Sequence, residues 1–135
     1  MDIFIIDAES LTDPLWLNTL PQLHVSIEFE PNSETSKYHH VYYLKIHEDD
    51  SETISALQKQ LKRGWYAFKI QSDRYTILFN DAVFNILHVD STSEAYISAQ
   101  HHGRMQGIQD EYLNFQSFIM RYTKQIQEFN SVGRS

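Results

Sequence analysis

The sequence predicts a single α+β domain, with a mostly antiparallel sheet of about five or six strands and helices packed on one face. Residues 64–89 contain three successive runs rich in aromatic and β-branched residues, separated by short polar turns, which is the pattern of an antiparallel meander. Helical patterns with capping signals precede and follow this meander. The chain has 135 residues, the size of one hydrophobic core, so residues 1–135 are predicted to form one domain with 131–135 frayed.

The first elements are a strand and a short helical segment. Residues 2–7 form an apolar run bounded by acids, which is typical of a buried strand. Asp13 followed by Pro14 predicts one or two helical turns that end before Pro21, because proline suits the first helical position.

Residues 23–30 give the clearest strand pattern, since apolar and polar side chains alternate along them. The alternation predicts a half-buried strand. Its buried face is expected to hold Leu23, Val25, Ile27 and Phe29. A polar connection at 31–37 leads to a strand at 40–47, and the two strands are expected to form a hairpin with a long loop.

Two of the three predicted longer helices carry clear end signals. One begins at Asp50 or Ser51 and ends at Gly64, in the left-handed conformation that suits glycine. Another covers 95–105 after a capping signal at 91–94. A third apolar stripe predicts a helix over 110–129.

Negative charge is concentrated in the first two fifths of the chain. The net charge is −7, and residues 1–52 contain eleven acidic residues and two lysines. A field of this sign repels phosphate backbones and attracts basic partners, so a protein partner is expected and nucleic acid is not. The expected partner-binding face is acidic: Glu28, Glu30, Glu34, Glu48, Asp49, Asp50 and Glu52. Trp16 is the expected exposed aromatic anchor, and plain solubility is the alternative reason for the acidic excess.

The sequence contains no complete catalytic or metal-binding motif, and neither a cofactor nor a metal is expected. The seven histidines include no His-Glu-x-x-His spacing, and adjacent pairs such as His101 and His102 diverge on a helix. Whether this pair holds a metal is left open. Asp7 and Glu9 follow the first strand and resemble the first motif of the DnaQ-like exonucleases. That resemblance implies an alternative function, a metal-dependent phosphodiesterase or nuclease.

Composition also bears on the compartment. The chain has no cysteine, which suits a reducing compartment, and no pattern of a cleaved secretion signal. No stretch approaches the ~20 apolar residues of a membrane span. We therefore expect a cytoplasmic protein without membrane contact.

Residues 64–115 resemble a family of small bacterial proteins of unassigned function. The resemblance is carried by Gly64-Trp65-Tyr66-Ala67, Phe79, Phe84-Asn85-Ile86, Gly103, Gly107-Ile108 and Leu113-Asn114-Phe115. It implies no catalytic residue. At the level of class, a small, acidic, cysteine-free chain rich in Tyr, Asn, Gln and His resembles the immunity proteins of bacterial toxin systems, including contact-dependent growth inhibition. This second resemblance implies a module that neutralises a cognate, often basic, toxin; the oligomeric state is left open.

Overall fold

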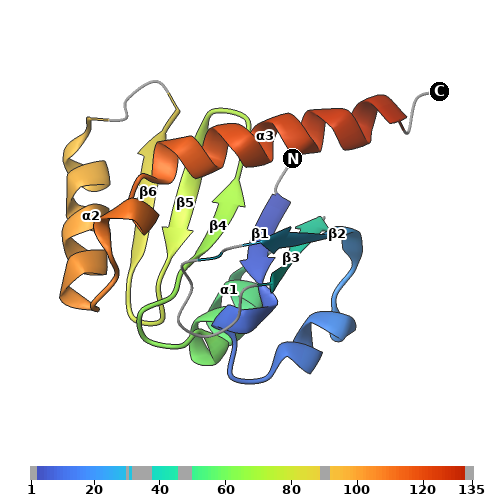
Figure 1. Cartoon of the computed structure of the whole chain (residues 1–135), viewed down its shortest axis with the longest axis horizontal. Helices are drawn as coiled ribbons and strands as arrows, with labels where there is room; N and C mark the ends of the chain where they lie inside the picture. The colour runs from blue at the N-terminus through green and yellow to red at the C-terminus, as the bar shows by residue number, and fades with distance from the viewer. Residues whose placement is uncertain (1–2, 30, 32–37, 46–49, 89–91, 133–135) are drawn as a thin grey trace.

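The six strands found among the described residues belong to one antiparallel sheet. The computed structural model describes residues 3–29, 31, 38–45, 50–88 and 92–132. The strands are β1 (Ile3–Asp7), β2 (Gln22–Phe29), β3 (Tyr38–Lys45), β4 (Ala67–Ile70), β5 (Arg74–Leu78) and β6 (Val83–Leu87). They lie in the order β2-β3-β1-β4-β5-β6, and all neighbouring pairs are antiparallel (Figure 1). The predicted α+β class is confirmed.

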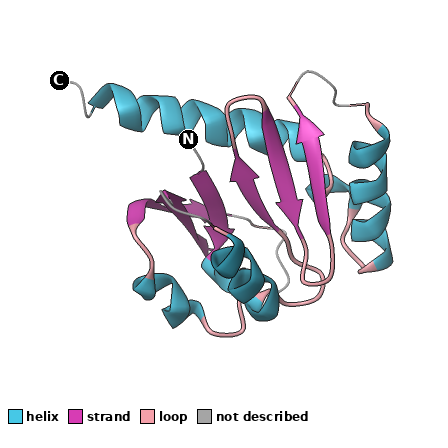
Figure 2. Cartoon of the chain, turned by 180° about the vertical axis from the view of Figure 1, so that it is seen from behind, coloured by secondary structure: helices cyan, strands magenta, loops and turns pink. Residues whose placement is uncertain are grey.

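Helices cover both faces of the sheet, whereas one face was predicted. The α-helices are α1 (Ser51–Gln60), α2 (Glu94–Met105) and α3 (Phe115–Val132). Short 3-10 helices are η1 (Ala8–Ser10), η2 (Pro14–Thr19) and η3 (Asp110–Tyr112). In Figure 1, α3 crosses in front of the strands and α2 stands beside β6; in Figure 2, seen from behind, α1 lies in front of the sheet.

The central strand explains the second covered face. In β1, Ile3 and Ile5 point toward α3, while Phe4 and Ile6 point toward α1, and all four are at most 3% exposed. A strand that is apolar on both sides needs cover on both sides. The core on the α3 side includes Tyr43, Phe68, Ile77, Phe79, Phe115 and Ile119. The core on the α1 side includes Leu11, Leu17, Leu44, Leu57, Leu61 and Leu78.

The predicted meander is present as β4, β5 and β6. Its first turn is closed by the Gln71 backbone N–H, which donates to the Arg74 carbonyl at 2.8 Å. Helix α1 ends at Gln60 and Leu61 is already extended, so Gly64 does not end the helix as predicted. Gly64 lies in the loop before β4 with a φ of +87°, the left-handed conformation predicted for it. Farther along, Ser93 caps α2, since its Oγ accepts from the Tyr96 N–H at 3.2 Å.

Besides the end of α1, two predicted boundaries and one face differ from the structure. The helix expected at 110–129 begins at Phe115, because η3 and a short connection occupy the preceding residues. It continues to Val132, so the first two residues expected to fray are helical, and 133–135 lie outside the described residues. Strand β2 turns its apolar side chains outward, as described below.

Candidate functional site

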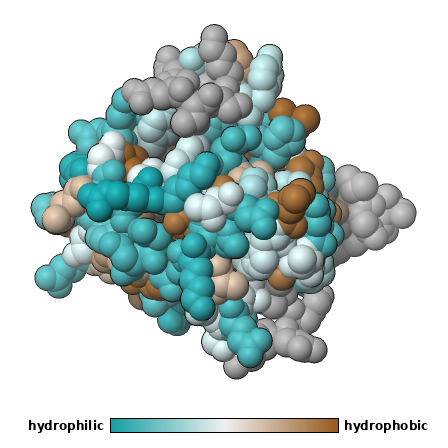
Figure 3. All heavy atoms as spheres, turned by 90° about the horizontal axis from the view of Figure 1, so that it is seen from below, coloured by the Kyte–Doolittle hydropathy of each residue, from teal (hydrophilic) through white to brown (hydrophobic). Residues whose placement is uncertain are grey.

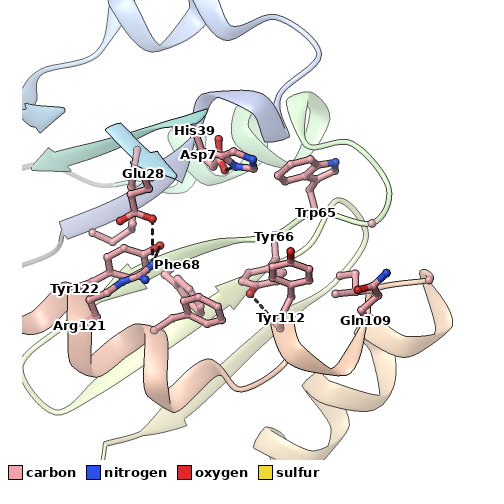
Figure 4. A pocket seen from close by; sticks show the side chains of 16 residues that line it. Asp7, Glu28, His39, Trp65, Tyr66, Phe68, Gln109, Tyr112, Arg121 and Tyr122 are labelled. Atoms are coloured by element: carbon pink, nitrogen blue, oxygen red, sulfur yellow. Dashed lines mark hydrogen bonds and ion pairs between the residues drawn. The ribbon is translucent and has the colours of Figure 1, made fainter. Parts of the chain in front are cut away.

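A pocket of about 290 Å³ lies between the sheet and α3, and is bounded by η3 and the loop after α1 (Figure 4). Its walls are mostly aromatic and apolar, with two separate pairs of charged side chains among them. The lining residues include Ile5, Asp7, Glu28, His39, Val41, Trp65, Tyr66, Phe68, Gln109, Tyr112, Phe118, Arg121 and Tyr122.

The first charged pair is Asp7 with His39. Asp7 ends β1 opposite Val41 of β3, and His39 lies two residues before Val41, so both side chains face α3. Asp7 Oδ2 contacts His39 Nδ1, while Asp7 Oδ1 accepts from the Glu9 backbone N–H at 2.8 Å. The Asp7 side chain is 20% exposed and that of His39 9%. Burial raises the pKa of Asp7, and the hydrogen bond and charge of His39 oppose that rise.

The second charged pair is Glu28 with Arg121. Arg121 Nη2 donates to Glu28 Oε2 at 3.1 Å and to the Tyr122 hydroxyl at 3.3 Å. The guanidinium also lies over two rings of α3, 5.1 Å from the Tyr122 centroid and 5.3 Å from that of Phe118. These contacts hold a planar cation against aromatic faces, which is a favourable arrangement for arginine.

The aromatic side chains of the pocket are held by contacts across several elements. The Tyr66 hydroxyl donates to the Tyr112 carbonyl at 2.5 Å, which ties the loop before β4 to η3. Trp65 lies beside His39, with ring centroids 5.7 Å apart. Figure 4 shows Trp65 next to the Asp7 and His39 pair, Glu28 next to Arg121 and Tyr122, and Tyr66 next to Tyr112.

A second feature is an exposed apolar row on the opposite face of the sheet, at its β2 edge. Val25, Ile27 and Phe29 are 38%, 67% and 57% exposed, and Tyr38 of β3 is 59% exposed. Phe29 and Tyr38 pair across the strands, with ring centroids 5.2 Å apart. In the view from below, hydrophobic patches gather toward the right, the side that carries β2 and β3 in Figure 1 (Figure 3).

The predicted burial of this row is wrong for a physical reason. The polar residues of β2 face α3 instead. There Glu28 pairs with Arg121, and the ring centroids of His24 and Phe129 lie 4.1 Å apart. The α1 side of the sheet is covered over its middle by α1 and η2, and that cover leaves the β2 row open. Alternation therefore identified the two faces but not which of them is covered.

The predicted acidic face is not one surface in the described part of the chain. Glu28 is half-buried on the α3 side. Asp50 precedes α1 and pairs with Lys69 at 2.5 Å, and Glu52 is exposed in the first turn of α1. Trp16 is half-buried against the α1-side core instead of being a fully exposed anchor. The remaining predicted acids lie outside the described residues: Glu30, Glu34, Glu48 and Asp49.

The metal-dependent alternative gains no support from the geometry. Both carboxylate oxygens of Asp7 already have partners, one of them the Glu9 backbone. His101 is exposed, and His102 Nε2 lies 2.8 Å from Asp81 Oδ1. Within residues 3–29, 31, 38–45, 50–88 and 92–132, no three His, Cys, Asp or Glu side chains come together as a metal site would require.

Sequence reasoning named Glu28 and Asp7 but missed their partners. His39 shares alternate positions with the buried residues Val41 and Tyr43, so the strand period was a usable signal that it faces the core. Arg121 is 93 residues from Glu28, and no local pattern links the two.

Comparison with protein-family models, with curated proteins and with solved structures found no match to this chain. Among the described helices, none combines the length and apolar character that a membrane crossing requires. The site must therefore be interpreted from its own chemistry.

Proposed function

We propose that this chain is a protein-binding module, specifically an immunity protein that binds and neutralises a cognate basic toxin through its β2 edge. The observation that carries the proposal is the exposed apolar row of Val25, Ile27 and Phe29 with Tyr38. Isolated exposed apolar residues are common on proteins, but a contiguous row along one strand is typical of an interaction site.

The position of the row at the sheet edge supports the same function. Strand β2 has eight residues, and within the described part of the chain it pairs only with β3. An edge strand of this length presents backbone donors and acceptors to which a partner strand can add. Backbone hydrogen bonds would then provide affinity, while Ile27 and Phe29 would provide apolar anchors.

Charge supports a basic partner. The chain carries a net charge of −7, so its long-range field attracts positive surfaces and speeds their association at low salt. Glu28 and Asp50 are each paired within the chain, which reduces their share in a direct contact. The proposal therefore assigns attraction to the overall acidic charge and anchoring to the β2 row.

Two matched variants test the site. Ile27→Glu places a charge within the row, and Ile97→Glu makes the same change on α2, where Ile97 is 57% exposed, similar to the 67% of Ile27. The proposal predicts a toxin gene directly beside this one, and we expect the wild type and Ile97→Glu to form a complex with the purified toxin. Ile27→Glu should weaken that complex by at least about tenfold, since interface anchors typically contribute 2 kcal/mol or more.

Two results would contradict the proposal. One is a toxin complex that Ile27→Glu leaves as tight as the wild-type complex. The other is a wild-type homodimer, measured by light scattering, that Ile27→Glu dissociates into monomers. That second result would assign the β2 edge to self-association.

A further inference from the structure

We propose that the pocket between α3 and the sheet binds a small planar aromatic base, meaning a flat ring that carries a cationic or amino nitrogen. This inference concerns the α3 side of the sheet and does not rest on the proposed function, because the exposed apolar row of β2 lies on the opposite face. It rests on the shape, the aromatic walls and the charge balance of the pocket.

Size and shape limit the ligand to a small one. A volume of about 290 Å³ is at the low end for ligand pockets. The floor is the sheet, at Ile5, Val41 and Phe68, and the wall facing it comes from α3 and η3, at Phe118 and Tyr112. A space between the sheet and an aromatic wall suits a planar ring, since offset and edge-on ring contacts are both favourable.

Charge balance favours a base over an acid. Among the described residues, two carboxylates line the pocket, those of Asp7 and Glu28, and Arg121 is the lining side chain with a permanent positive charge. His39 forms a pair with Asp7, and the other described lining residues carry no basic group. An anionic ligand would meet no net positive charge there. Both carboxylates already have partners within the chain, so they would attract a cationic ring nitrogen or amidine through the charge of the pocket wall, while the aromatic faces attract the cation directly.

The rim provides polar groups that can orient such a ligand. The Gln109 amide lines the pocket, and its side chain makes no hydrogen bond within the described residues. Trp65 lines the same space next to the Asp7 and His39 pair, and its indole N–H has no acceptor in the part of the chain that the structure describes. Trp65 is therefore a suitable reporter of binding.

The test uses benzamidine as the basic probe and benzoate as an anionic probe of similar size and shape. The chain has two tryptophans, so Trp16→Phe leaves Trp65 as the single indole N–H signal in a ¹⁵N correlation spectrum. We expect millimolar benzamidine to shift the Trp65 signal with saturation, and benzoate to leave it in place. No shift with benzamidine, or equal shifts with both probes, would overturn the proposal.

Glu28→Gln tests the charge argument directly. Removing this carboxylate takes one negative charge out of the pocket wall, so benzamidine should bind about tenfold more weakly. Benzoate should now bind. Glu94→Gln changes an exposed acid on α2 that does not line the pocket, and both affinities should stay as in the wild type. Unchanged probe preference in Glu28→Gln would contradict the assignment.

Discussion

The contact between Asp7 and His39 is expected to contribute strongly to the stability of the fold. Replacing His39 with glutamine leaves the Asp7 carboxylate in a largely buried position without its ionisable partner. Breaking such a buried pair from one side typically costs 3–5 kcal/mol, and the 20% exposure of the Asp7 side chain favours the lower end. We therefore expect the free energy of unfolding to fall by about 3 kcal/mol, a large part of the 5–15 kcal/mol typical of a domain.

The neighbouring residue provides a matched control. His40 lies on the opposite side of β3 and is exposed, so His40→Gln should change stability by no more than about 0.5 kcal/mol. Both variants can be compared with the wild type by urea denaturation at pH 7, followed by circular dichroism. Equal effects of the two substitutions would refute the assigned role of His39.

The pH dependence follows from the raised pKa of Asp7. A carboxyl whose pKa is higher in the folded state stabilises the fold below its ordinary pKa, and that contribution is lost as pH rises through the folded value. In His39→Gln, nothing from His39 lowers the pKa of Asp7, so the free energy of unfolding should decline as pH rises from about 4 toward 7. The double variant with Asp7→Asn should show no such decline, and additive single effects would contradict coupling of the pair.

Three further variants probe packing, ionisation and the open edge. A Cβ at Gly103 would lie 2.4 Å from Leu113 Cδ2, and Leu113 is buried. Gly103→Ala should therefore lower the free energy of unfolding by about 1–3 kcal/mol. An unchanged melting temperature would show that the Leu113 side chain can move aside without cost. Burial raises the pKa of Tyr43 to about 12. Part of the folding stability should therefore be lost as pH rises from about 10 through that value. In alkaline unfolding experiments, Tyr43→Phe should reduce this loss. Ile27→Glu should keep the wild-type melting temperature, because Ile27 is 67% exposed; a large drop would mean that the row belongs to the core.

Local chemistry in the sequence was sufficient for most of the elements. The meander from β4 to β6, the left-handed conformation of Gly64 and the cap of α2 each depend on neighbouring residues, and each was predicted correctly. The end of α1 was predicted at Gly64, four residues beyond its actual end at Gln60. The boundary of α3 was missed because an apolar stripe continues upstream through η3 residues that form only a 3-10 turn.

Features that depend on distant pairing were not predictable. Strand β1 pairs with β3 and β4, not with its sequence neighbour β2, and this order brings His39 to Asp7. The outward orientation of Ile27 follows from how far α1 and η2 extend across the sheet. A single strand's alternation contains no information about that extent.

The central claim is that the β2 edge neutralises a toxin, and a growth assay tests it most directly. The proposal predicts a toxin gene directly beside this one, and cells would express that toxin together with the wild type, Ile27→Glu or Ile97→Glu, with equal protein levels verified. The proposal predicts growth with the wild type and with Ile97→Glu, and arrest with Ile27→Glu. Arrest with the wild type would contradict the immunity function, and growth with Ile27→Glu equal to the wild type would contradict the β2 edge as its site.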